Sequence, residues 1–212
     1  MKINNINSSY SQSFSSKKLF SATLLKKASN GIKEPVRAFI SELQAEDIGR
    51  KDLCISRWKR TLFAEDILED FKAWYTPASS EKLCIPEYCG KHRFFAVETP
   101  SPKGTKTIAM AEIKVLDDFI VLDRLQTLIK SKRAKNHLAG AGSSLVYTIA
   151  QLAQQMKKKF IVLETHKNSV GFYKKIGFKK QENSSFNFYR LFQDKYSDFL
   201  DRTGSKLNIE KV

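Results

Sequence analysis

Hydrophobic and polar positions alternate in three consecutive segments of the chain, which is the pattern of half-buried strands. The segments are residues 93–98 (RFFAVE), 107–115 (TIAMAEIKV) and 119–129 (FIVLDRLQTLI). Turn-forming residues separate them, with two prolines and a glycine in the first gap and Asp117-Asp118 in the second. The pattern therefore predicts an antiparallel meander of three strands.

After this meander the pattern predicts alternating helices and strands. Apolar residues at helical spacing predict a helix over about 142–156, and the compact apolar run at 160–164 predicts a strand. A short helix through Tyr173 ends at Gly177, which suits a helix C-cap. Residues 186–192 alternate like a final strand. The tail from residue 194 is expected to add a helix and to fray at its end.

The part of the chain before the meander is predicted to be helical. Pro35 can open a helix, and four apolar residues follow it at helical spacing up to Leu43. A stronger apolar stripe predicts a second helix over about 58–74, which Thr76-Pro77 stops. Residues 79–90 have the composition of a loop.

Composition limits the class of protein. The chain has 212 residues, 42% of them hydrophobic, which is enough for one well-buried domain with an appendage. No run of about eighteen apolar residues occurs, so a membrane-spanning helix is not expected. Lys and Arg number 37 against 22 Asp and Glu, and the net charge of +15 indicates an anionic partner. The charge is concentrated in residues 1–33, with six lysines and no acid, and in residues 129–181, with twelve cations against Glu164 alone.

Residues 1–33 are predicted to be a disordered, basic leader rich in Ser and Asn, because their apolar residues are too scattered to form a packed face. The segment lacks the continuous apolar stretch and cleavage site of a Sec signal peptide. Its composition resembles that of the uncleaved leaders of bacterial effectors exported by specialised secretion systems. A plain N-terminal extension is the alternative. The protein is therefore expected in the cytoplasm, or in a host cell after export through this leader.

The odd number of cysteines argues against a disulfide framework and for reduced thiols. Cys84, Cys89 and His92 have the spacing C-x4-C-x2-H. A zinc site would need a fourth ligand, which Cys54 could supply only through folding that no spacing predicts. Buried thiols near a strand are the preferred interpretation, and no metal is predicted.

The sharpest chemical signal is the loop His137-Leu138-Ala139-Gly140-Ala141-Gly142, between a predicted strand and a predicted helix. Glycines let the backbone approach an anion closely, and the following helix presents unpaired N–H groups. A pyrophosphate suits such a site, and cations just before the loop, Lys135 among them, can bind further phosphate. The alternative is a plain strand-to-helix turn whose glycines serve only packing. Neither the Walker nor the Rossmann glycine pattern matches.

Two motifs, in order, resemble the GNAT acetyltransferase superfamily over about residues 93–193. H-L-A-G-A-G at 137–142 is similar to the family's Q/R-x-x-G-x-G/A, and F-Y-K-K-I-G-F at 172–178 is similar to its F-Y-x-K-x-G-F. The resemblance implies an α/β (α+β) fold with a mixed sheet: antiparallel strands, a Gly-loop, a CoA-binding helix and splayed strands, here with extra N-terminal helices. It also implies an enzyme that uses acetyl-CoA as cosubstrate and transfers acetyl directly to an amine.

The resemblance further assigns roles to residues. Pantetheine would pair like an extra strand with the edge near 125–129, and backbone amides of 138–143 would hold the pyrophosphate. Tyr173 matches the family tyrosine that lies near the thioester sulfur and protonates the leaving thiolate. With Lys135, the expected cofactor-binding residues are Leu128, Ile129, His137, Leu138, Ala139, Gly140, Ala141, Gly142, Ser143, His166 and Asn168.

Two positions depart from the family pattern. His137 replaces the usual Gln or Arg and is a poorer partner for phosphate. The Asn that usually lies seven residues before the tyrosine is His166 here, while Asn168 lies five before it. Either side chain can contact CoA, and the loop must differ from the common form.

A general base must take a proton from the acceptor amine, and family bases are commonly acids on the central strands. The candidates are Glu112, then Asp123, then Glu98, all on strands expected to line the cleft. A shift of one residue in register would turn any of them to the other face, and the alternative for each is an exposed carboxylate at a strand edge.

The expected organisation is a leader (1–33), a helical part that binds the acceptor (34–90), an acetyl-CoA-binding core (91–193) and a tail (194–212). The leader and the large N-terminal part favour a macromolecular acceptor, a protein more than tRNA. The alternatives are a toxin that acetylates the amino acid on charged tRNA, and a non-catalytic module that binds nucleic acid or another anion. The sequence leaves open whether the chain is a monomer or a homodimer.

Overall fold

The computed structural model describes residues 17–27, 32–44, 47, 67, 69–70, 91–101, 104–127, 138–182 and 187–212. Within these ranges a ten-stranded sheet has the order β10-β1-β2-β3-β4-β5-β7-β9-β8, and β6 pairs with β1 beside this path. The strands are β1 (Lys17–Lys27), β2 (Lys33–Glu42), β3 (Lys91–Ser101), β4 (Gly104–Val115), β5 (Phe119–Thr127), β6 (Leu138–Ala139), β7 (Phe160–Glu164), β8 (Lys179–Lys180), β9 (Phe188–Phe192) and β10 (Glu210–Lys211). The helices are α3 (Ala141–Gln155), α4 (Val170–Lys175) and α5 (Tyr196–Leu207), with a 3-10 turn at Gln193–Lys195 before α5.

The predicted meander is confirmed in β3, β4 and β5, which pair antiparallel in chain order. β7 then joins β5 in parallel, because α3 carries the chain back across the sheet. The other elements predicted after the meander are confirmed as α3, β7, α4, β9 and α5. The sheet is thus mixed and mostly antiparallel, as the predicted fold class requires.

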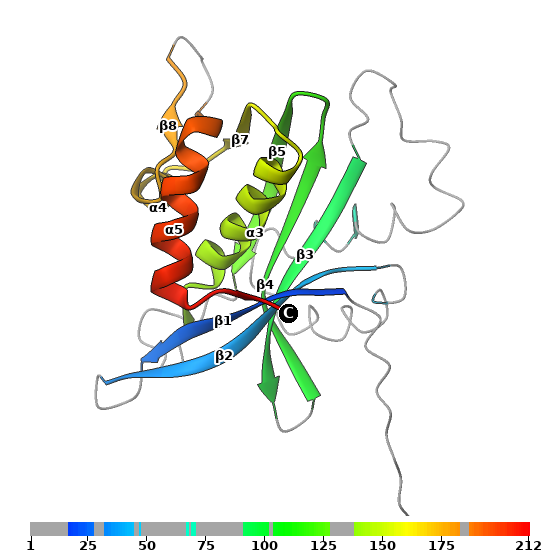
Figure 1. Ribbon diagram of the computed structural model, residues 1–212, viewed down its shortest axis with the longest axis vertical. Helices are drawn as coiled ribbons and strands as arrows, with labels where there is room; N and C mark the ends of the chain where they lie inside the picture. The colour runs from blue at the N-terminus through cyan, green and yellow to red at the C-terminus, as the bar shows by residue number, and fades with distance from the viewer. Residues whose placement is uncertain are drawn as a thin grey trace, which may run out of the picture.

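The two long helices, α3 and α5, lie side by side on one face of the sheet (Figure 1). On α3, Leu145 and Ile149 share one stripe and are fully buried against the strands. On α5, Tyr196 and Phe199 are buried in the same hydrophobic cluster. The helices can approach closely at Gly204, where an added Cβ would lie 3.3 Å from the ring of Tyr147.

The helix predicted from Pro35 to Leu43 is wrong, because these residues form strand β2. The apolar residues there also fit a period of two, and Ala38 and Ile40 are both fully buried in the core. β2 pairs with β1 along one edge and with β3 along the other. These two ladders and the shared core outweigh the helical spacing, as tertiary context often does.

The prediction that the leader is disordered is also wrong for residues 17–27, which form β1. Ala22 and Leu24 are buried, so the scattered apolar residues lie at the period of a strand. The expected fraying of the tail is wrong as well, because β10 pairs with β1, with Phe20 opposite Lys211. Segments near both ends of the chain therefore lie side by side (Figure 1). Residues 1–16 lie outside the described residues.

Other predictions fall largely outside these ranges. The helix expected over 58–74 is described only at Ile67, Glu69 and Asp70, which are helical. The predicted loop 79–90 and all three cysteines lie outside the described residues. None of the helices found in the described ranges combines the length and the hydrophobicity that a bilayer-crossing segment needs.

Shortening Leu24 tests whether residues 17–27 belong to the core. Leu24→Ala should lower the free energy of unfolding by about 2–5 kcal/mol, because the leucine is fully buried and its loss leaves a cavity. Urea denaturation measures the change, with Lys17→Ala, an exposed position on the same strand, as the control. Equal stability of the two variants would contradict the placement of β1 in the core.

Candidate functional site

The site is organised by a fork between β5 and β7. These strands are in parallel register only at residues 119–121 and 160–162. Beyond Val121, β5 continues to Thr127 without a described partner on the β7 side, while it stays paired with β4 on its other side. The fork therefore leaves a stretch of backbone N–H and C=O groups facing the gap, and such an edge can pair with an extended ligand.

The glycine-rich loop and the start of α3 lie at the mouth of this fork. Gly140 occupies the N-cap position of α3 with φ 106°, a left-handed conformation that favours glycine. The helix has no side-chain cap and no acidic residue in its first turn. Its first N–H groups therefore face the mouth with the positive end of the helix dipole, which suits an anion.

The two glycines of the loop differ in their surroundings. A Cβ added at Gly140 would lie 2.9 Å from Leu207 Cδ2 and 3.2 Å from Leu24 Cδ2, in addition to the strained φ. A Cβ added at Gly142 would meet Phe172 and its other neighbours at ordinary van der Waals distances of 3.4 Å or more. Only Gly140 is thus required by geometry, whereas Gly142 has room for alanine.

The glycine-rich loop and the β5–β7 fork open into a cleft of about 1680 Å³. The sequence-predicted site residues that line it are Asp123, Leu138, Ala139, Gly140, Ala141, Gly142, Ser143, His166, Asn168 and Tyr173. Glu112 and Glu98 do not line it. Leu128, Ile129, Lys135 and His137 lie outside the described residues. The structure therefore brings most of the predicted residues together around one cavity.

Tyr173 reaches the cleft from α4. Gly177, with φ 105°, ends this short helix, and Phe178 N–H donates back to the Tyr173 carbonyl. The ring packs edge-on between Phe172 and Phe178, with centroids 5.0 and 5.6 Å away. Burial raises the pKa of the phenol to about 12. Tyr173 therefore stays protonated near neutral pH and can act as a proton donor.

The turn before α4 is held by its own hydroxyl groups. Thr165 Oγ1 and Ser169 Oγ are 2.8 Å apart, and Ser169 Oγ donates to the His166 carbonyl at 3.1 Å. This network fixes the backbone on which His166 and Asn168 stand at the cleft wall.

Glu112 lies in a polar cluster on the sheet face opposite α3. Its side chain is fully buried, with Oε1 2.9 Å from His92 Nδ1 and Oε2 accepting from Arg124 at 3.3 Å. Arg124 also pairs with Asp70 and lines the cleft. Burial raises the pKa of Glu112 to about 8 and lowers the pKa of His92 to about 4. A single proton on the carboxyl can then be donated to the neutral imidazole.

Asp123 stands at an irregularity of β5. The β4–β5 register shifts there, because Glu112 faces Arg124 while Ile113 faces Leu122, leaving Asp123 as the extra residue. Such a bulge redirects the side chain that carries it. The Asp123 carboxylate lines the cleft and pairs with Lys114 Nζ at 2.8 Å.

Several cleft residues were missed by sequence reasoning. They are Lys26 and Lys33 on β1 and β2, Arg202 and Lys206 on α5, and Glu164 at the end of β7. The sequence pattern places Lys26 and Lys33 in the leader and α5 in the tail, and it connects neither with the loop. The spacing of Arg202 and Lys206, four residues apart on one helix face, was the available signal.

The described residues provide no set of ligands for a metal ion. In the ranges that the structure describes, no three His, Cys, Asp or Glu side chains come together as a metal site would need. His92 is one member of the C-x4-C-x2-H spacing, and its Nδ1 is bonded to Glu112. Cys84 and Cys89 lie outside the described residues.

Solved structures similar to this chain include an N-acetyltransferase, PaiA from Thermoplasma acidophilum in complex with coenzyme A. It shares 20% identity, with 72% of this chain and 96% of that chain covered and a TM-score of 0.47. AtaTR bound with AcCoA shares 13% identity, with coverages of 76% and 96% and a TM-score of 0.48. Tetrahymena GCN5 shares 12% identity, with coverages of 70% and 85% and a TM-score of 0.43. No protein-family model matches the sequence, and no curated protein matches it.

The pair of Glu112 and His92 predicts a specific dependence of stability on pH. The ordinary pKa values are 4.5 and 6.5. Between pH 4.5 and 6.5 the folded chain holds one proton, on Glu112, and the unfolded chain also holds one, on His92. The contributions of the two groups to the pH dependence of stability therefore cancel. From pH 6.5 to 8 only the folded chain holds the proton. The free energy of unfolding should then fall by about 2 kcal/mol.

Glu112→Gln should remove this fall above pH 6.5. In the variant, stability should instead rise from pH 4 to 6.5, because the lowered pKa of His92 is no longer offset. Urea denaturation between pH 4 and 8.5 gives both curves, and Glu210→Gln, at an exposed position, serves as the control. A fall of wild-type size in the Glu112→Gln variant would show that another group causes it.

Proposed function

We propose that this protein is an acetyl-CoA-dependent N-acetyltransferase that transfers acetyl directly to an amine. The observation that carries the proposal is the uncapped start of α3 behind Gly140, placed at the mouth of the β5–β7 fork. Tyr173, a protonated phenol, lines the same cleft. The two motifs that resemble the GNAT family therefore meet around one cavity.

The residues present fit acetyl-CoA. The first N–H groups of α3 form a donor set for the pyrophosphate, with no carboxylate in that turn to compete. The edge of β5 beyond Val121, which has no partner on this side among the described residues, offers donors and acceptors to the two amides of pantetheine. Leu125 and Phe172 add apolar surface to the cleft wall beside these groups.

When bound, acetyl-CoA supplies an acetyl group activated as a thioester. The cleft residues then have two tasks, to hold the thioester carbonyl beside the acceptor amine and to manage two protons. Tyr173 donates a proton to the departing sulfur. A phenol with a pKa of about 12 is fully protonated at neutral pH but is a weaker acid than a thiol, whose pKa is about 8.5, so Tyr173 hydrogen-bonds the departing sulfur and its phenolate regains a proton from solvent after the transfer.

We assign the proton acceptor to Asp123 rather than to Glu112. Asp123 lines the cleft and is partly exposed, whereas the Glu112 carboxyl is fully buried and engaged by His92 and Arg124. A base must come within hydrogen-bonding reach of the proton that it takes. Glu112 instead holds the Arg124 guanidinium in place from behind the cleft wall.

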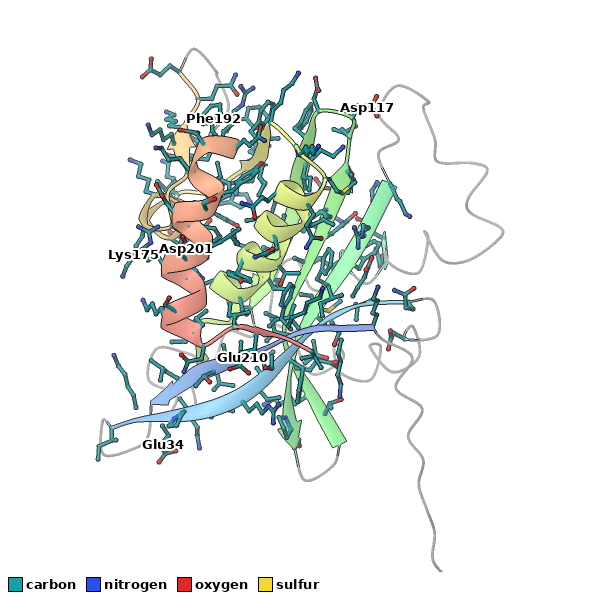
Figure 2. The ribbon with its side chains drawn as sticks, viewed as in Figure 1. Glu34, Asp117, Lys175, Phe192, Asp201 and Glu210 are labelled. Carbon is teal, nitrogen blue, oxygen red and sulfur yellow. The ribbon has the colours of Figure 1, made fainter. Side chains whose placement is uncertain are left out.

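The proposed acceptor is a protein amine. Two lysines that follow α3, Lys158 and Lys159, bear on the choice between a protein and a nucleic acid. Lys158 Nζ donates to the Leu116 and Asp117 carbonyls at 2.7 Å each, and Lys159 Nζ lies 2.9 Å from Asp118. Asp117 lies at the top of the view and Glu34 near its lower end (Figure 2). These two lysines stabilise the β4–β5 turn, which weakens the case for tRNA or another nucleic acid as the partner.

Export to a host cell is part of the same proposal and now concerns a shorter segment. Strand β1 begins at Lys17 and belongs to the sheet. A secretion signal in the predicted leader would therefore lie in residues 1–16, which contain six serines and one lysine.

Isothermal titration with acetyl-CoA tests the proposal at the loop. The wild type should bind acetyl-CoA, and Gly140→Ala should weaken binding at least about tenfold, because it strains φ and pushes against Leu207 and Leu24. Gly171→Ala is the matched control, because a Cβ there would meet no atom within 4 Å and the residue does not line the cleft, and it should bind within about twofold of wild type. Absence of binding heat for the wild type at saturating acetyl-CoA would refute the proposed function.

Tyr173→Phe tests the role of the phenol. The substitution keeps the ring packed between Phe172 and Phe178 and removes only the proton donor. kcat for acetyl transfer to an amine-bearing protein or peptide should fall by about 10²–10⁴, with KM for acetyl-CoA nearly unchanged. Tyr189→Phe, at a buried tyrosine that does not line the cleft, is the control. An unchanged kcat would remove Tyr173 from the mechanism.

A further inference from the structure

We propose that the β1–β2 hairpin and α5 form a cationic subsite for the 3′-phosphate of coenzyme A. The subsite would consist of Lys26, Lys33, Arg202 and Lys206, all of which line the cleft. This inference rests on the proposed function, because it names the part of the same cosubstrate that these residues bind. It assigns a binding role to two segments that the sequence pattern presents as a leader and a tail.

Lys26 is placed at the loop by strand pairing. β1 pairs antiparallel with β6, so that Leu25 lies opposite Ala139 and Lys26 opposite Leu138. Directly opposed residues in such a pair have Cα atoms about 4.5–5.5 Å apart. Lys26 is therefore a neighbour of the loop that precedes the first turn of α3.

Arg202 and Lys206 are placed there by the packing of α5. Leu207 Cδ2 would lie only 2.9 Å from a Cβ added at Gly140, so the last turn of α5 touches the loop itself. Arg202 and Lys206 are four residues apart and share one helix face. Arg202 Nη2 also reaches to 4.0 Å from a Cβ added at Gly177, just beyond α4. The two cations thus stand between the loop and the end of α4.

The charges around the cleft are unbalanced. Over the part of the chain that the structure describes, Lys33, Arg202 and Lys206 have no acidic partner. Lys26 pairs with Glu34 at 3.8 Å, and both side chains are largely exposed. Gathering such cations around one cavity is unfavourable unless an anion neutralises them.

The acids that line the cleft belong to different elements. Asp123 lies on β5 and Glu164 at the end of β7, the two arms of the fork. The cations of the subsite come instead from β1, β2 and α5. Acetyl-CoA has the same division, with an uncharged acyl end that reacts and a nucleotide end with a phosphomonoester of about −2 charge at pH 7. The loop amides suit the pyrophosphate, which leaves the cations for the 3′-phosphate.

A comparison of CoA with dephospho-CoA tests the subsite, because the two ligands differ only in this phosphate. By isothermal titration, the wild type should bind CoA at least about tenfold more tightly than dephospho-CoA, as expected for charge-assisted hydrogen bonds. In the double variant Lys26→Ala/Lys206→Ala the preference for CoA over dephospho-CoA should fall severalfold, because only Lys33 and Arg202 of the subsite remain. The variant's affinity for dephospho-CoA should stay within about twofold of wild type. Lys211→Ala, an exposed lysine on β10 outside the cleft, should leave both affinities unchanged.

The outcomes separate this inference from the proposed function. Equal binding of CoA and dephospho-CoA by the wild type would overturn the subsite while leaving acetyl-CoA binding and transfer intact. An equal loss of affinity for both ligands in the double variant would also overturn it, because the lysines would then act on the fold or the loop. Binding of neither ligand by the wild type would overturn the subsite and the proposed function together. Circular dichroism of each variant shows that the comparison is made on folded protein.

Discussion

The contact at Gly140 is the constraint on which the rest of the structure depends. Its left-handed backbone turns the chain from β6 into α3, and side chains of Leu24 and Leu207 close on it from β1 and α5. A Cβ at this point would require the ends of both leucine side chains to shift, in a backbone conformation that already disfavours a side chain. One glycine therefore joins the first described strand, the last helix and the glycine-rich loop, so the packing of the core and the shape of the cleft are linked at this point.

Two kinds of polar chemistry meet at the β4–β5 bulge. One is the open cleft, where Tyr173 and Asp123 are available to a ligand. The other is the buried cluster of Glu112, His92 and Arg124 on the face opposite α3. Arg124 belongs to both, since it lines the cleft while its guanidinium is anchored by Glu112. Glu112 and His92 are uncharged near neutral pH, because burial raises the pKa of the first and lowers the pKa of the second, so the Arg124 guanidinium is the cation that this cluster holds at the cleft wall.

Sequence reasoning succeeded where a pattern was local. The meander, the loop and the helix carrying Tyr173 each have a signature within a few residues, and their order along the chain placed them together. It failed at β1 and β2, because a strand of moderate hydrophobicity is stabilised by its neighbours rather than by its own residues. For Glu112, the alternation of side chains along β4 decides whether the carboxyl group reaches the cleft or is buried, and a shift of one residue would reverse the outcome. The contribution of Lys26 and Lys206 could not be foreseen, since it depends on contacts between the two ends of the chain.

The net charge of +15 has several separate origins in the structure. Lys158 and Lys159 stabilise the β4–β5 turn through carbonyl and carboxylate oxygens. Lys114 pairs with Asp123 at the bulge. Cations that line the cleft and have no described acidic partner come from the hairpin and α5, around the loop, and from α4 at Lys175. A general affinity for polyanions would need an extended basic surface, whereas these side chains surround one cavity. The part of the charge that lines the cleft is better explained by a small ligand with several phosphates than by nucleic acid.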